Sequence, residues 1–264
     1  MTITGHTKTL AILADPVTHV RTPQALNRKF EEEGVDAVLV PLEVSAQDLA
    51  VAMTGLKACR NFAGFVVTVP HKTTIPALCD TLSSRAEAAQ SVNVIRRSAD
   101  GLLHGELLDG EGFALGLTRA GVKLAGKKVF LAGAGGAASA IAFSLAAQGI
   151  SALTVANRSA AKAEALLARL RQHFPDVALR AGTDPSDHNI AINGTSLGLK
   201  ADDPLPFDVA RLSDGTLVAE VIMQPEITAL LRAAEARDLK IHTGQHMLDA
   251  QLSEMFRFLT QDMT

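Results

Sequence analysis

Two charged residues in the first half of the chain, Lys72 and Asp109, have the types needed to move a proton. Lys72 comes shortly after the apolar run 64–69, so its amine is expected near the carboxyl end of a buried strand. Asp109 lies further along, in the segment GELLDG at 105–110. An amine and a carboxylate held together can act as an acid–base device. The alternative for Lys72 taken alone is an ordinary surface lysine.

The glycine-rich segment GAGGAA at 133–138 predicts a dinucleotide-binding turn. It follows the apolar run 128–132 and opens a stretch of small residues that is typical of a helix. In that context Gly133 permits a tight turn, Gly135 lets the backbone approach a pyrophosphate, and Ala138 allows close helix–strand packing. The N–H groups at the helix start then hold the anion. A glycine cluster alone would also fit a loop, so the strand before it and the helix after it carry the prediction.

The next predicted strand, 152–156, is followed by Asn157, Arg158 and Ser159. Sites for NAD usually place an acidic residue here, on the ribose 2′-hydroxyl. A guanidinium instead suits a 2′-phosphate, because it can make a bidentate, charge-assisted contact. The sequence therefore favours NADP(H), with NAD(H) left open. The alternative for Arg158 is a solvated loop residue.

A third cluster of small and hydroxyl residues, which includes Thr195, follows the predicted strand 190–193. Ligands of doubly wound sheets bind at the carboxyl ends of the strands, so these residues could lie close to a nicotinamide ribose. An ordinary turn would have the same composition. The histidines and the two cysteines, Cys59 and Cys79, show no metal-ligand spacing, and no metal is expected.

The composition excludes several classes of function. The chain has 264 residues, 47% of them hydrophobic and 20% charged, which is typical of a globular protein long enough for two modest domains. A net charge of −3 without a basic block argues against nucleic acid as a partner. No apolar run is long enough for a membrane span, and the start does not resemble a secretory signal, so a cytoplasmic protein is expected. Tyr and Trp are absent, which excludes a tyrosine acid.

Two α/β series are expected along the chain. In the first, short apolar runs alternate with helical stretches, a pattern that predicts a parallel sheet with helices on both faces. Its first helix is expected to have Thr22 as N-cap and Pro23 as first helical residue. The second series begins near residue 126. We expect a substrate domain at 1–109, completed by a C-terminal helix within 240–264, and a doubly wound Rossmann domain at 110–239, with a cleft between the two domains as the ligand site.

Taken together, the motifs resemble the shikimate dehydrogenase family. In the family's order, the chain has PxxH at 16–19, VTVPHK at 67–72, VN at 92–93, DGEGF at 109–113, GAGGAA at 133–138, NRS at 157–159, INGTSLG at 192–198 and GQHMLDAQ at 244–251. The match runs from Asp15 to Phe256. It implies an α/β substrate domain, a Rossmann NADP domain, and reversible reduction of 3-dehydroshikimate to shikimate within the shikimate pathway of aromatic amino acid biosynthesis.

Carried over by position, the resemblance assigns roles to single residues. The catalytic pair falls on Lys72 and Asp109. The remaining assignments are substrate contacts at Val20, Thr22, Thr68, Asn93 and Gln251, and cofactor contacts at Gly133, Ala134, Gly135, Gly136, Ala137, Asn157, Arg158, Ser159, Thr195, Met223, Gly244 and Met247. The expected partner is a small hydroxy acid, and a homodimer is left open.

The departures from the family pattern concern the side of the pocket that holds the substrate carboxylate. Where the family has two serines, this chain has Val20 and Thr22, and a family asparagine is replaced by Val66. A tyrosine is replaced by Met223, and the turn NTDG becomes LLDG. Each lost hydrogen bond to a charged group costs about 1.5–3 kcal/mol. Changed specificity is therefore expected, unless the neighbouring Arg21 compensates, and Arg21 could equally point into water.

Two alternatives remain open. One is a dehydrogenase for quinate or another polyol acid, using NAD or NADP. The other is a non-catalytic NAD(P)-binding sensor with a decayed pocket. Retention of Lys72, Asp109, Asn93 and Gln251 argues against decay.

Overall fold

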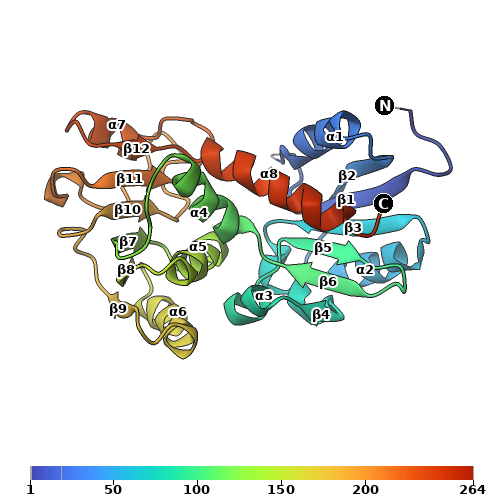
Figure 1. The fold of residues 1–264 in the computed structure, drawn as a ribbon, viewed down its shortest axis with the longest axis horizontal. Coiled ribbons are helices and arrows are strands. Elements are labelled where there is room, and N and C mark those ends of the chain that lie inside the picture. The colour runs from blue at the N-terminus through green and yellow to red at the C-terminus, as the bar shows by residue number, and fades with distance from the viewer. Residues whose placement is uncertain (1, 19, 264) are drawn as a thin grey trace. The chain divides into compact units, whose positions relative to one another are not determined.

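The computed structural model describes residues 2–18 and 20–263, with only the backbone at 248 and 249. It separates into two compact units, and each has its own sheet (Figure 1). Unit 1 comprises Met1–Leu108 and Leu252–Thr264, and unit 2 comprises Asp109–Gln251. The borders expected from the sequence are 109/110 and 239/240, so the C-terminal segment of unit 1 is shorter than that expectation.

Unit 1 is built on a six-stranded sheet with the strand order β2-β1-β3-β5-β6-β4. Its elements are β1 (Lys8–Ala14), α1 (Thr22–Glu32), β2 (Ala37–Glu43), α2 (Leu49–Ala58), β3 (Phe62–Val67), β4 (Thr81–Leu82), α3 (Ser84–Ala89), β5 (Val94–Arg97) and β6 (Leu103–Glu106), with short 3-10 helices at His71–Thr73 and Ile75–Leu78. The core combines residues of β1, α1 and β3 with Met255 and Leu259 from the end of the chain.

The expectation of a parallel first sheet is correct for only part of the sheet. β1, β2 and β3 are parallel, but β5 runs antiparallel to β3, and β6 runs antiparallel to β5. The turn around Gly101 (φ +87°) joins β5 and β6 as a hairpin, and two strands joined by so short a turn must run in opposite directions.

The first helix also begins differently from the prediction. Thr22 is its first helical residue, Arg21 takes the N-cap position, and no side chain there accepts a hydrogen bond from the helix. Thr22 is half-buried and Arg21 is exposed. The hydroxyl of Thr22 is therefore not used as a cap.

Unit 2 has a fully parallel six-stranded sheet, as predicted, with the order β12-β11-β10-β7-β8-β9. Its elements are α4 (Asp109–Arg119), β7 (Lys128–Ala132), α5 (Gly136–Ala147), β8 (Ala152–Ala156), α6 (Ala160–His173), β9 (Ala178–Ala181), β10 (Ile190–Asn193), β11 (Leu217–Glu220), α7 (Ala229–Glu235), β12 (Ile241–His242) and α8 (Gln245–Thr260), with a 3-10 helix at Val209–Arg211. The last helix, α8, continues past Gln251 into unit 1. Among the described residues, no helix combines the length and apolar character needed to cross a bilayer.

Candidate functional site

The glycine loop lies at the carboxyl end of β7, in the middle of the parallel sheet of unit 2. Gly133 has φ +114°, and a Cβ there would be 2.8 Å from the carbonyl oxygen of Gly194, so only glycine fits. Gly135 is the N-cap of α5 and has no side chain to occupy the helix start. A Cβ at Gly135 or Gly136 would meet nothing within 4 Å. The loop thus offers backbone N–H groups and space, which suits a pyrophosphate.

The segment 157–159 lies beside this loop. The N–H of Gly133 donates to the carbonyl of Ala156, the last residue of β8, at 2.7 Å. Asn157 donates from Nδ2 to the carbonyl of Ser159 at 2.9 Å, and Ser159 caps α6. Arg158 is exposed, and in the part of the chain that the structure describes its guanidinium has no ion pair or side-chain hydrogen bond. An unengaged guanidinium beside a pyrophosphate loop suits a 2′-phosphate.

On the other side of β7, the ends of β10 and β11 are joined by a buried carboxylate that the sequence analysis missed. Glu220 is fully buried and accepts hydrogen bonds from Asn193 Nδ2 at 2.9 and 3.1 Å. Asn193 Oδ1 in turn accepts from the N–H and hydroxyl of Thr195, at 3.0 and 2.7 Å. The only signal in the sequence was a charged residue at the end of an apolar run. Such a residue is more often exposed.

Of the cofactor residues expected in the last part of unit 2, Met223 lies close to this cluster along the chain, and Gly244 lies against the neighbouring Ile222. Met223 follows Glu220 by three residues and is 43% exposed. Gly244 is buried, and a Cβ there would be 2.4 Å from the carbonyl oxygen of Ile222, so the two segments approach each other through glycine. Met247, in the first turn of α8, is half-buried.

Two predicted site residues that are 142 positions apart are hydrogen-bonded. Gln251 Nε2 donates to Asp109 Oδ1 at 2.6 Å, and both side chains are buried. Asp109 opens α4, and Gln251 lies on α8. The helices approach closely at Gly112, where a Cβ would be 2.7 Å from that of Gln251. The Gln251 amide therefore fixes the orientation of the buried Asp109 carboxylate.

In unit 1, two of the predicted substrate residues, Thr68 and Asn93, lie with Lys72 at the carboxyl end of β3. The N–H of Thr68, just after β3, donates to the carbonyl of Leu13 at 3.1 Å, and the N–H of Val67 donates to the carbonyl of Asn93 at 2.8 Å. Lys72 is half-buried in the 3-10 turn after β3. The preceding residue, His71, is buried, and its Nε2 lies 2.8 Å from the carbonyl oxygen of Val44, which anchors the turn.

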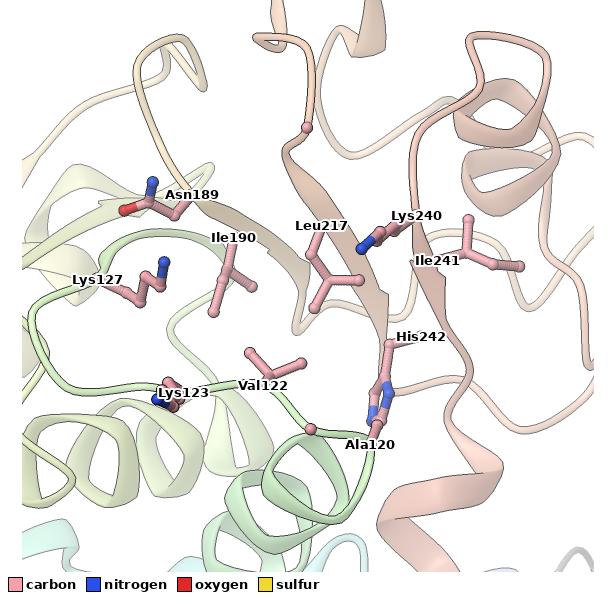
Figure 2. Close-up of a pocket in the computed structure, with 12 residues that line it drawn as sticks. Ala120, Val122, Lys123, Lys127, Asn189, Ile190, Leu217, Lys240, Ile241 and His242 are labelled. Carbon is pink, nitrogen blue, oxygen red and sulfur yellow. The ribbon is translucent and has the colours of Figure 1, made fainter.

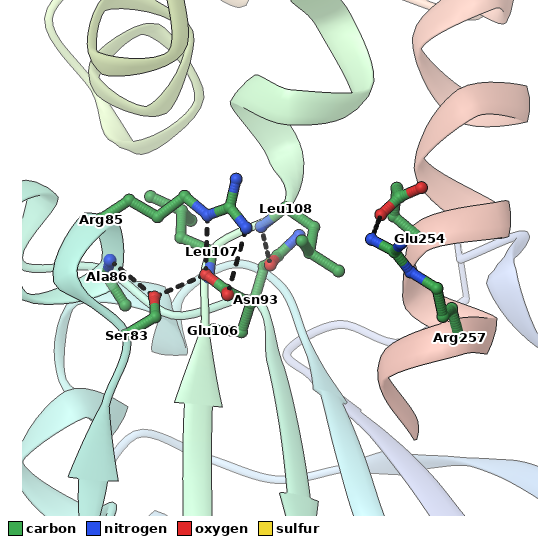
Figure 3. A network of polar contacts seen from close by, with 9 residues as sticks. All are labelled: Ser83, Arg85, Ala86, Asn93, Glu106, Leu107, Leu108, Glu254 and Arg257. Carbon is green, nitrogen blue, oxygen red and sulfur yellow. Dashed lines mark hydrogen bonds and ion pairs between the residues drawn. The ribbon is translucent and has the colours of Figure 1, made fainter. Parts of the chain in front are cut away.

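A polar network fixes Asn93 at this end of β3 (Figure 3). The Leu108 N–H donates to Asn93 Oδ1 at 2.8 Å. Glu106 accepts from the Ser83 hydroxyl at 2.6 Å, from Arg85 Nε at 3.0 Å and from the Leu107 N–H at 2.7 Å. The network sets the path of the chain immediately before Asp109, although the side chains that do this are not those of the family's NTDG pattern.

Two of the three predicted carboxylate-holding positions, Val20 and Val66, are apolar and packed inward, whereas Thr22 is half-buried and keeps a hydroxyl. Val66 is 2% exposed and belongs to the core of unit 1, and Val20 packs against the same core. Neither side chain can donate a hydrogen bond. Arg21 lies exposed next to Val20. His19, which belongs to the PxxH pattern, lies outside the described residues.

Figure 2 shows a cavity of about 650 Å³ in unit 2. It lies at the amino-terminal ends of β10, β11 and β12, whereas the glycine loop follows the carboxyl end of β7. Its apolar wall is formed by Val122, Ile190, Leu217 and Ile241, and Lys123, Lys127 and Lys240 surround it. Burial lowers the pKa of His242, which also lines it, to about 4, so this imidazole is neutral at pH 7. Because ligands of parallel sheets bind at the carboxyl ends of the strands, this cavity is not the cofactor site. No group of three potential metal ligands occurs among the described residues.

Comparison with known proteins connects both units to one group of enzymes. Residues 12–95 match the family model of the shikimate dehydrogenase substrate binding domain, and residues 115–181 match that of shikimate / quinate 5-dehydrogenase. Shikimate dehydrogenase (NADP(+)) of Rubrobacter xylanophilus is 39% identical over 253 residues, which cover 93% of this chain and 88% of that protein.

Solved structures give the same grouping. Shikimate 5-dehydrogenase from Listeria monocytogenes, in complex with shikimate and NAD, superimposes with a TM-score of 0.91 at 30% identity, covering 99% of this chain and 94% of that one. The ligand-free form of 5-ketofructose reductase of Gluconobacter sp. strain CHM43 gives a TM-score of 0.88 at 30% identity, covering 97% and 93%. These likenesses confirm the predicted α/β fold with its Rossmann-type sheet.

Proposed function

The chain belongs to the shikimate dehydrogenase family, and on that premise we propose that it is an NADP-dependent dehydrogenase that interconverts a secondary alcohol and a ketone on a shikimate-like hydroxy acid. The NADP preference is supported by the relative from Rubrobacter xylanophilus, which is named as an NADP(+) enzyme, and by the unengaged guanidinium of Arg158. A cytoplasmic location and a homodimer stay predictions.

The observation that carries the proposal is the buried hydrogen bond between Gln251 and Asp109. A carboxylate held at 2.6 Å by an amide keeps one orientation, which a group that exchanges protons with a substrate needs. The glycine loop of unit 2 supplies the complementary part, a backbone anion site at the carboxyl edge of a parallel sheet.

In the proposed mechanism, bound NADP(H) supplies the hydride chemistry, and the protein handles the proton. Thr68 and Asn93 bind and orient substrate hydroxyl groups from the carboxyl end of β3 in unit 1. Lys72 and Asp109 are the residues that accept the alcohol proton on oxidation and return it on reduction. Gln251 keeps Asp109 in the orientation that this transfer requires.

The proposal is tested by following reduced nicotinamide absorbance with shikimate, quinate and other hydroxy acids, each with NADP⁺ and with NAD⁺. We expect turnover of at least one hydroxy acid and a preference for NADP⁺. Cofactor binding without turnover of any substrate would contradict the dehydrogenase and favour the non-catalytic sensor.

A second candidate function is reduction of a neutral polyhydroxy ketone. It is favoured by the apolar, inward-packed Val20 and Val66, which offer no hydrogen-bond donor to a carboxylate. The similarity to 5-ketofructose reductase, whose substrate by its name is a ketose, supports it as well. Including 5-ketofructose with NADPH in the substrate panel decides between the two candidates.

Adding a hydroxyl at position 20, with serine in place of the threonine hydroxyl at position 22, should strengthen carboxylate binding. In the double variant Val20→Ser with Thr22→Ser, we expect KM for shikimate to fall by about tenfold, because a hydroxyl donor to a carboxylate contributes about 1.5–3 kcal/mol. KM for neutral polyols should change little. Steady-state kinetics of the double variant and of the unsubstituted chain, with shikimate and with a neutral polyol, provide the measurement. An unchanged KM for shikimate would show that these positions do not hold the carboxylate.

Loss of the guanidinium at position 158 should weaken NADP⁺ selectively. For Arg158→Gln we expect KM for NADP⁺ to rise by about tenfold or more, because a charge-assisted contact to the 2′-phosphate is lost. KM for NAD⁺ should stay the same. Arg171→Gln, an exposed arginine near the end of α6 that pairs with Glu164, is the matched control. Equal loss for both cofactors would contradict the assignment of Arg158.

A further inference from the structure

The buried carboxylate of Glu220 is held without a cation. Its side chain is fully buried, and no ion pair involves it among the described residues. Besides Asn193, it accepts hydrogen bonds from the N–H groups of Val221 at 2.9 Å and Ile222 at 3.1 Å, and from the hydroxyl of Thr228 at 3.0 Å. Burial raises the pKa of Glu220, while these donors act to lower it. A fully donor-lined buried carboxylate of this kind fixes the groups around it.

The donors of Glu220 come from three different segments. Asn193 ends β10 and orders the next loop through Thr195 and through the carbonyl of Leu197, which accepts from Asn193 Nδ2 at 2.9 Å. Val221 and Ile222 begin the loop that carries Met223. Thr228 caps the start of α7. One carboxylate therefore sets the positions of both loops that leave the strand ends of β10 and β11.

The strand order shows which half of a cofactor these loops would contact. Arg158 follows β8 on one side of β7, whereas Thr195 and Met223 follow β10 and β11 on the other side. A dinucleotide with its pyrophosphate at the loop after β7 and its 2′-phosphate at Arg158 must extend its nicotinamide half toward β10 and β11. The loops tied by Glu220 are thus at the nicotinamide end.

We infer that Glu220 is a positioning residue that holds the loops of Thr195 and Met223 in the arrangement that binds the nicotinamide half of NADP(H). This inference rests on the proposed function. Only a carboxylate fits the role, because Oε1 accepts from three N–H groups and Oε2 from an amide and a hydroxyl. A glutamine would place an NH₂ group against one of these donor sets.

The test compares two ligands on the full chain, NADP⁺ and 2′,5′-ADP, which lacks the nicotinamide half. For Glu220→Gln we expect the affinity for NADP⁺ to fall by about tenfold, and the affinity for 2′,5′-ADP to stay unchanged. Both are measured by isothermal titration calorimetry. Glu220→Asp keeps the charge but shortens the side chain, so it should show the same selective loss of NADP⁺ affinity. It replaces the glutamine variant in the test if that variant does not fold.

Thr216→Val is the matched control. Thr216 precedes β11, at the opposite end of that strand, is 2% exposed, and donates a buried hydrogen bond to the carbonyl of His188 at 2.8 Å. It should lose stability without changing either affinity. An unchanged NADP⁺ affinity in both Glu220 variants, or equal loss of both ligands, would overturn the inference. Failure of the unsubstituted protein to bind either ligand would instead count against the proposed function.

Discussion

Lys72→Ala should lower kcat of the alcohol–ketone reaction by about a hundredfold or more, the size typical of losing a general acid–base group. The affinity for NADP⁺ should not change, because Lys72 belongs to unit 1, whereas the glycine loop and Arg158 belong to unit 2. Steady-state kinetics with the best substrate of the panel, together with calorimetric titration of NADP⁺, separate the two quantities.

The matched control for this prediction is Lys57→Ala in the same unit. Lys57 lies on α2, is 39% exposed and pairs with Asp80 at 2.7 Å. Exposed ion pairs contribute only about 0–1 kcal/mol to stability, so kcat should be unaffected. If Lys72→Ala turned over substrate at a near-normal rate, the lysine would have no part in the proton transfer. If both variants lost activity equally, the effect would come from the fold of unit 1.

The parallel sheet of unit 2 could be predicted from the sequence because its strands are continuous apolar runs followed by helices. In unit 1 this pattern of apolar strands followed by helices is interrupted by β6. Its sequence, LHGE, contains a histidine, a glycine and a glutamate. A segment of that composition does not look like a strand. It becomes one because β5 pairs with it and Glu106 is held by Ser83 and Arg85. Tertiary contacts of this kind are not visible in local sequence.

The parts of the candidate site differ in how far they could be predicted from the sequence. The glycine loop could be predicted from local order alone, because strand, turn and helix adjoin in the chain. The contact of Asp109 with Gln251 could not, since no spacing rule links residues 142 positions apart, and Gln251 was assigned only through the family resemblance. Glu220 was missed because its role depends on Asn193 from the neighbouring strand. A single carboxylate at a strand end gives no hint of four donor groups converging on it.

The second large effect is expected at Gly112, where α4 and α8 meet within unit 2. A Cβ at this position would lie 2.7 Å from the Gln251 Cβ and 2.9 Å from the Met247 carbonyl oxygen. Gly112→Ala should therefore lower the free energy of unfolding by about 1–3 kcal/mol through overpacking. It should also lower kcat by about tenfold, because α8 must move and take the Gln251 amide away from Asp109. Urea unfolding and steady-state kinetics measure the two effects.

Gly55→Ala is the matched control, which separates the effect of overpacking at Gly112 from the general effect of replacing a helical glycine by alanine. Gly55 is a helical glycine of α2 whose Cβ would meet nothing within 4 Å. Alanine there should raise the free energy of unfolding by about 0.5–1 kcal/mol and leave kcat unchanged, because alanine is the better helix former. The same glycine-to-alanine substitution should thus lower the free energy of unfolding at position 112 and raise it at position 55. A Gly112→Ala protein that was as stable and as active as the unsubstituted chain would show that the α4–α8 approach tolerates a methyl group, and that Gln251 does not depend on it to reach Asp109.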